Sequence, residues 1–120
     1  MMAAESLRTE VLTIAQRQQK RSEDDLFALL EYEWQRVGLA SVERGPTGDY
    51  LRKVARDIGR EAIQERGTIE VMTGVIADKV LNWATQQGIA LDQYALMFGL
   101  LVAWIVRAVL KDRSNDGQDA

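Results

Sequence analysis

The chain has 120 residues and a mass of 13.5 kDa, the size of one ordinary domain, and its 47% hydrophobic and 28% charged residues are typical of a globular protein. Cysteine and histidine are both absent, which excludes disulfides, Cys/His zinc sites, Ser-His-Asp triads and the usual proton shuttle at neutral pH. A net charge of −3 and a pI near 5.0 argue against a generally basic nucleic-acid-binding protein.

The first two segments are predicted to be amphipathic helices. Apolar residues recur every three or four positions along the chain, and glycines divide it into five such segments. The first helix is expected from about Ala3 to Gln19. Ser22 is expected to cap the second helix, because its hydroxyl can accept a hydrogen bond from a free amide of the first turn, and Gly38 is expected to end it.

Residues 39–48 are predicted to form the longest loop, because they contain the sequence Gly45-Pro46-Thr47-Gly48. A glycine-bearing loop before a helix can bind phosphate, but this one lacks the Gly-Lys-Ser/Thr ending of a P-loop and follows no strand. A turn is therefore the preferred interpretation. Asp49 or Thr47 is expected to cap the third helix, and Gly67 to end it.

Thr68 is expected to begin the fourth helix and Gly88 to end it. Asp92 is expected to cap the last helix, which is predicted to run to about Arg113. The sequence thus predicts a single helical domain over residues 1–113 and a flexible polar tail over residues 114–120.

The last helix differs from the others because it is apolar nearly all round between Tyr94 and Val106. Such a helix must be surrounded by protein or lipid. The thirteen uncharged residues would extend about 20 Å as a helix, against a hydrocarbon thickness of about 30 Å, which favours a buried core helix over a membrane span. The predicted fold is therefore an all-α, compact five-helix bundle with a central apolar C-terminal helix.

A row of small residues on the last helix, Ala95, Gly99 and Ala103, indicates close packing, since another backbone can approach where bulky side chains are missing. The preferred partner is the fourth helix near Gly74 and Ala77. A dimer seam built from the same row is the alternative.

The sequence gives no support for an enzyme, and we expect no catalytic residue, no cofactor and no metal. Glu61 and Glu65 can share a helix face, but a carboxylate di-metal bundle normally adds histidines, and the chain has none. Lys79 would serve as a nucleophile if it were desolvated, and nothing in the sequence indicates that it is.

The charge pattern of the third helix is the most informative polar feature. It consists of a basic row and an acidic row, each with a spacing of four residues and turned from one another by about 100°. The basic row is Arg52, Arg56 and Arg60, and the acidic row is Asp57, Glu61 and Glu65. Like charges at this spacing destabilise a helix by tenths of a kcal/mol per pair. The pairs Asp49–Lys53, Lys53–Asp57 and Asp57–Arg60 are expected to offset part of this cost, which would leave a solvated, self-compensated face.

The functional interpretation is a basic ridge that meets a complementary acidic surface on the second helix. The partner-binding residues are then Arg52, Lys53, Arg56 and Arg60 on the ridge, and Glu23, Asp24, Asp25 and Glu31 on the acidic surface. Two opposed patches on one domain permit head-to-tail association. This predicts a non-catalytic protein–protein interaction or assembly module that self-associates through charged helix faces or joins a larger complex. Its start lacks a secretory signal, so a cytoplasmic location is expected.

Two alternatives remain open. The ridge, joined by Arg17, Lys20 and Arg21, would suit a small accessory subunit that contacts nucleic acid within a nucleoprotein complex, although no recognised nucleic-acid-binding motif is present. A membrane-associated regulator that uses the last helix is the third possibility.

Overall fold

The computed structural model describes residues 4–37, 47–64 and 67–119, and these contain α-helices and no strand. The predicted all-α fold is therefore confirmed. The helices are α1 (Ala4–Gln18), α2 (Glu23–Arg36), α3 (Thr47–Ala62), α4 (Ile69–Gln86) and α5 (Ala95–Asp119), with a short 3-10 helix at Leu91–Gln93 between α4 and α5.

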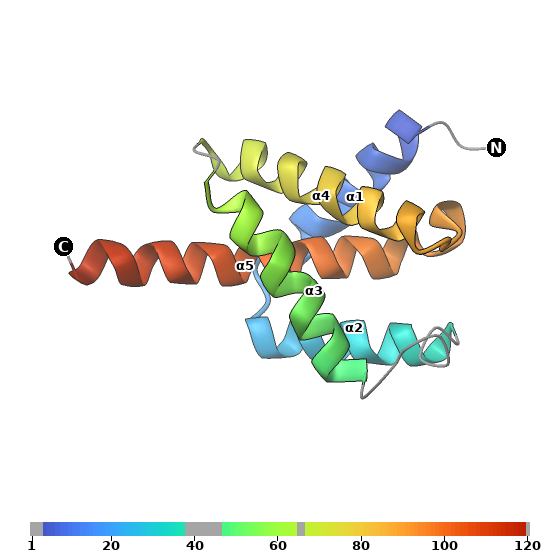
Figure 1. Ribbon diagram of the computed structural model, residues 1–120, viewed down its shortest axis with the longest axis horizontal. Coiled ribbons are helices and arrows are strands. Elements are labelled where there is room, and N and C mark those ends of the chain that lie inside the picture. Colours follow the sequence, from blue (N-terminus) through green and yellow to red (C-terminus); the bar gives the residue numbers. More distant parts are fainter. Residues whose placement is uncertain (1–3, 38–46, 65–66, 120) are drawn as a thin grey trace.

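α5 is the central helix, as predicted. It contacts each of the other four helices. In Figure 1, α1 and α4 lie above α5, α2 lies below it, and α3 crosses it on the way from α2 to the beginning of α4. Every residue from Met97 to Val106 is buried, so this uniformly apolar stretch is surrounded by the protein itself. Among the described residues, no helix combines the length and apolarity that crossing a membrane requires.

The other helices each contribute one apolar stripe to the core around α5. The residues of each stripe follow the three- and four-residue spacing of an amphipathic helix. The buried ones include Leu7, Val11 and Ala15 of α1, Leu26, Leu30 and Trp34 of α2, Leu51, Val54, Ile58 and Ala62 of α3, and Met72, Ile76 and Val80 of α4.

Three predicted helix ends are confirmed by their hydrogen bonds. The Ser22 hydroxyl accepts from the amide of Asp25 at 3.1 Å, and the Thr68 hydroxyl accepts from the amide of Val71 at 3.2 Å. At the end of α4, Gly88 has φ +72° and its amide donates to Thr85, a left-handed conformation that glycine adopts without strain.

Other predicted ends are wrong by several residues. α5 begins at Ala95 and not beside Asp92, because Tyr94 (φ −125°, ψ 27°) separates it from the 3-10 helix that contains Asp92. α5 also continues past Arg113 to Asp119, since no proline interrupts this stretch and one interior glycine costs only about 1 kcal/mol.

α3 begins at Thr47, which places Asp49 in its first turn, and its last residue is Ala62, ahead of Gly67. Gly38 and the Gly45-Pro46 part of the predicted loop lie outside the described residues.

The small-residue row on α5 packs against a different helix from the one predicted. A Cβ on Gly99 would lie 2.5 Å from the Cβ of Ile14 and 3.3 Å from the carbonyl oxygen of Val11, both on α1. Gly74 of α4 also faces α1, at the guanidinium of Arg8. α1 therefore lies closely against both α4 and α5 and already covers Gly99 within one chain, which leaves no dimer seam at that position.

Candidate functional site

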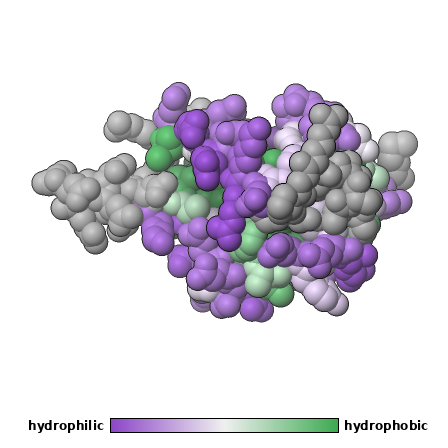
Figure 2. Space-filling model, turned by 60° about the horizontal axis from the view of Figure 1, so that its bottom comes forward, coloured by the Kyte–Doolittle hydropathy of each residue, from purple (hydrophilic) through white to green (hydrophobic). Residues whose placement is uncertain are grey.

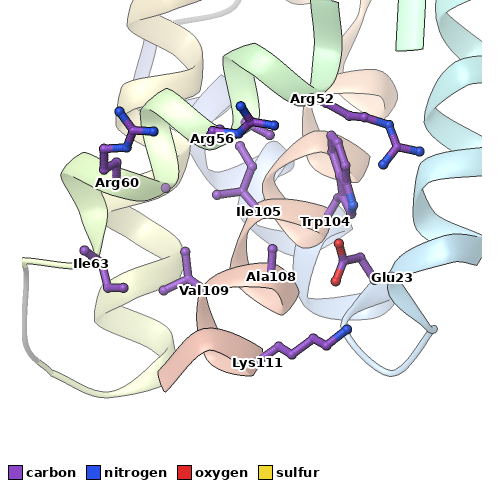
Figure 3. Close-up of a pocket in the computed structure, with 12 residues that line it drawn as sticks. Glu23, Arg52, Arg56, Arg60, Ile63, Trp104, Ile105, Ala108, Val109 and Lys111 are labelled. Atoms are coloured by element: carbon purple, nitrogen blue, oxygen red, sulfur yellow. The ribbon is translucent and has the colours of Figure 1, made fainter. Parts of the chain in front are cut away.

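A groove runs between α3 and α5 beside the start of α2, with a volume of about 420 Å³. It combines a basic edge with an apolar floor (Figure 3). Its lining residues are Arg52, Ala55, Arg56, Gly59, Arg60 and Ile63 from α3, Trp104, Ile105, Ala108, Val109 and Lys111 from α5, and Glu23 from α2. We call this feature the arginine groove.

The basic edge is the row of arginines that the sequence singled out. Arg52, Arg56 and Arg60 stand one turn apart along α3 and all three are exposed (Figure 3). Within the part of the chain that the structure describes, Arg56 and Arg60 form no ion pair or hydrogen bond. Two guanidinium groups at the edge of the groove thus have no ionic partner among the described residues.

Arg52 is held differently from the other two arginines. Its guanidinium carbon lies 4.3 Å from the centroid of the Phe27 ring, and that ring lies 4.7 Å from the ring of Trp104. A cation–π contact at an exposed site contributes about 0.5–1 kcal/mol. These three side chains, from α3, α2 and α5, join the helices at one end of the arginine groove.

The floor of the groove is apolar. Ile105 and Val109 of α5 are buried in the core cluster, and Ile63 and Ala108 are half-buried beside them. In Figure 3 these side chains lie next to the arginine row and point into the same space. A ligand that fills the groove would therefore contact apolar side chains and guanidinium groups at once.

The far side of the groove carries one acidic and one basic residue. Glu23, in the first turn of α2, and Lys111 of α5 lie across from the arginines in Figure 3. Neither forms an ion pair with any described residue. The groove thus has four basic side chains against one carboxylate, although the whole chain carries a net charge of −3.

A second groove, of about 470 Å³, lies on the neighbouring face of α3, between α3 and α4. Its charges are balanced, since it is lined by Lys53, Asp57, Glu61 and Lys79, and the Lys79 ammonium pairs with Glu61 at 3.1 Å. Lys53, predicted to bind the same partner as the arginines, therefore lies on this balanced face. The arginine row, by contrast, borders a groove in which basic side chains outnumber carboxylates.

The predicted charge pairs along α3 do not form. Within the described residues, no ion pair joins Asp49 to Lys53, Lys53 to Asp57, or Asp57 to Arg60. The carboxylate of Glu61 turns instead to Lys79 on α4, because the two helices pack side by side. The arginine row is therefore not offset by its own helix.

The remaining predicted site residues lie outside both grooves. Asp24 and Asp25 are exposed in the first turn of α2, and Glu31 is half-exposed two turns further on. Arg17 and Arg21, predicted to extend the basic ridge, line neither groove. At the other end of α2, the hydrogen bond and charge of Glu33 raise the pKa of the Arg36 guanidinium above its ordinary value.

Lys20 likewise lies outside both grooves. The sequence analysis did not predict the lining residues from α5, nor Ile63 beside the end of α3. Trp104 is 95% buried and so belongs to the core as well as to the groove. The signal that would have found the α5 side is that Trp104, Ala108 and Lys111 recur every three or four residues on one face of that helix.

Among the described residues, no cluster of three or more carboxylates is placed to hold a metal ion. Comparison with known proteins adds no functional clue, since no family model, no curated protein and no solved structure matches the chain.

Proposed function

We propose that the protein is a non-catalytic interaction module whose arginine groove binds an acidic, amphipathic helix of a protein partner. The observation that carries the proposal is a row of arginines that form no ion pair with any described residue, beside an apolar floor. Helices bind grooves of this kind by laying an apolar stripe on the floor, while charged residues on the flank pair with the edge. Charge complementarity then selects acidic partners over basic ones.

The size of the groove supports a helix as the ligand. Arg52 and Arg60 are eight residues apart, which corresponds to about 12 Å along α3. That length accommodates about two turns of a partner helix, with one acidic residue per turn opposite the arginines.

Nucleic acid is the second candidate partner, because guanidinium groups also bind phosphates. The apolar floor favours a protein partner, since a phosphate backbone offers the floor no apolar group. The separation of Lys53 from the arginine row also shortens the basic surface.

The test is the binding of a synthetic helical peptide with a glutamate at every turn beside a stripe of leucines, followed by fluorescence anisotropy at low salt. We expect the Arg56→Glu/Arg60→Glu variant to lose at least about tenfold in affinity, because two attractive contacts become repulsive. Lys53→Glu is the control, since it reverses a charge on the same helix, three residues from Arg56, in the other groove. We expect it to change the affinity less than about twofold.

Two further ligands separate the alternatives. A peptide with lysines in place of the glutamates should not bind, and a labelled random oligonucleotide should bind weakly and with little dependence on Arg56. Equal loss of affinity in the groove variant and the Lys53→Glu control would refute the groove as the site. Oligonucleotide binding that is tighter than peptide binding, falls steeply with salt and requires Arg56 and Arg60 would establish the nucleic-acid alternative instead.

A further inference from the structure

We infer that the partner helix is α2 of a second copy of this chain, so that copies associate head to tail. The inference rests on the proposed function and names the occupant of the same groove. Three features of α2 support it: an exposed apolar stripe, an acidic edge beside that stripe, and a location that leaves both outside the groove of their own chain.

The apolar stripe lies on the side of α2 that faces away from the core. Tyr32 is 63% exposed and Leu29 is 36% exposed, and Ala28 lies exposed next to them on the helix. Exposed apolar side chains at this spacing form the part of an amphipathic helix that enters a groove. The stripe thus supplies what the apolar floor of the arginine groove requires.

The acidic edge follows the stripe along its side. Asp24 and Glu31 are seven residues apart, which is two turns or about 10.5 Å, and so lie on one face of α2. This closely matches the 12 Å or so between Arg52 and Arg60. Neither carboxylate forms an ion pair with a described residue, so both are available to the arginines of another chain.

The two surfaces cannot meet within one chain. α2 is fixed against the core by Leu26, Leu30 and Trp34, and neither Leu29 nor Tyr32 lines the groove. Figure 2, which brings the underside of the molecule forward, shows separate apolar areas on this side, each bordered by hydrophilic side chains. The contact is therefore between different patches of two chains, and a head-to-tail contact of this kind, made once between each pair of neighbours, propagates into open chains or rings.

The association should be weak and sensitive to salt. Two turns of helix that bind in a groove of about 420 Å³ bury little surface. The buried area is far below the roughly 800 Å² per partner of a standard interface. We therefore expect a dissociation constant of about 0.1–1 mM, weakened further as salt screens the exposed charges. The mass-average molar mass should rise with protein concentration without a plateau at two chains.

The test combines two variants that each lack one of the two surfaces. The groove variant is Arg56→Glu/Arg60→Glu, and the face variant is Leu29→Lys/Tyr32→Lys, and all of these side chains are exposed. Light scattering at millimolar concentration should show each variant alone as a monomer. An equimolar mixture of the two variants should form a dimer and no larger species. The intact groove of the face variant can bind the intact face of the groove variant, and no second pair of intact surfaces remains. Lys53→Glu, with its change in the other groove, should associate like the unmodified protein.

Circular dichroism first establishes that each variant is folded. Glu31→Lys serves as a second face variant, which changes the charge of the acidic edge and leaves the apolar stripe intact. An unmodified protein that stays monomeric at millimolar concentration and low salt would overturn this inference. The peptide test would then decide separately whether the groove binds other acidic helices. Association of the unmodified protein without dimer formation in the mixture would also overturn it, because other surfaces would then be responsible.

Discussion

Gly99 is the position where a single methyl group should disturb the fold most clearly. A Cβ at this residue would lie 2.5 Å from the Cβ of Ile14 and 3.3 Å from the carbonyl oxygen of Val11. Both atoms are close to or part of the α1 backbone, so neither can move aside without shifting that helix. Gly99→Ala should therefore force α1 away from α5.

The expected magnitude follows from two opposing contributions. Inserting a methyl group into a well-packed contact typically costs about 1–3 kcal/mol. Replacing glycine by alanine inside a helix raises the free energy of unfolding by about 1 kcal/mol. Because the contact here is with a β-branched side chain and a main-chain oxygen, we expect the upper part of the range, and a net loss of about 1–2 kcal/mol in the free energy of unfolding.

Gly59 and Gly74 provide matched controls for the same substitution. A Cβ on Gly59 would lie 3.4 Å from a methyl group of Val109, so Gly59→Ala should stabilise the protein by up to about 1 kcal/mol. A Cβ on Gly74 would meet the far end of the flexible Arg8 side chain, so Gly74→Ala should be nearly neutral. Urea denaturation followed by circular dichroism measures all three. A Gly99→Ala variant as stable as Gly59→Ala would refute the packing of α1 on α5 described above.

Further predictions concern the caps, the core and the charges. Ser22→Ala should lower the free energy of unfolding in urea by about 1 kcal/mol, whereas Ser22→Asp, which keeps a side-chain acceptor, should retain most of the stability of the unmodified protein. Leu101 is fully buried in α5, and Leu101→Ala should cost about 2–5 kcal/mol; a smaller loss would contradict its central place. Arg56→Ala should change stability by less than about 0.5 kcal/mol, since Arg56 has no partner among the described residues; a larger loss would indicate a structural role. Asp78→Asn, which weakens an exposed pair with Arg8, should cost less than about 1 kcal/mol in thermal unfolding.

The order and the inward faces of the helices follow from local signals in the sequence. Ser22, Thr68 and Gly88 act on backbone groups within a few residues, so their roles can be predicted without knowing the fold. The uniformly apolar stretch around Phe98 must be covered by other helices, which places α5 at the centre of the bundle.

Contacts between distant segments could not be predicted in the same way. Nothing near Gly99 in the sequence shows whether α1 or α4 fills the space beside it, because that choice depends on how all the helices cross. The arginine groove is a similar case. The row on α3 is visible as a pattern, but its apolar neighbours Ile105 and Val109 come from α5, more than forty residues away in the chain.

The most direct test of the arginine groove is to map the acidic peptide on the protein by methyl NMR. Binding should shift the methyl signals of Ile63, Ile105 and Val109, which line the groove, and leave those of Val54 and Ile58, in the groove between α3 and α4, nearly unchanged. Shifts centred on Val54 and Ile58, or no shifts at saturating peptide, would contradict the assignment of this groove as the binding site.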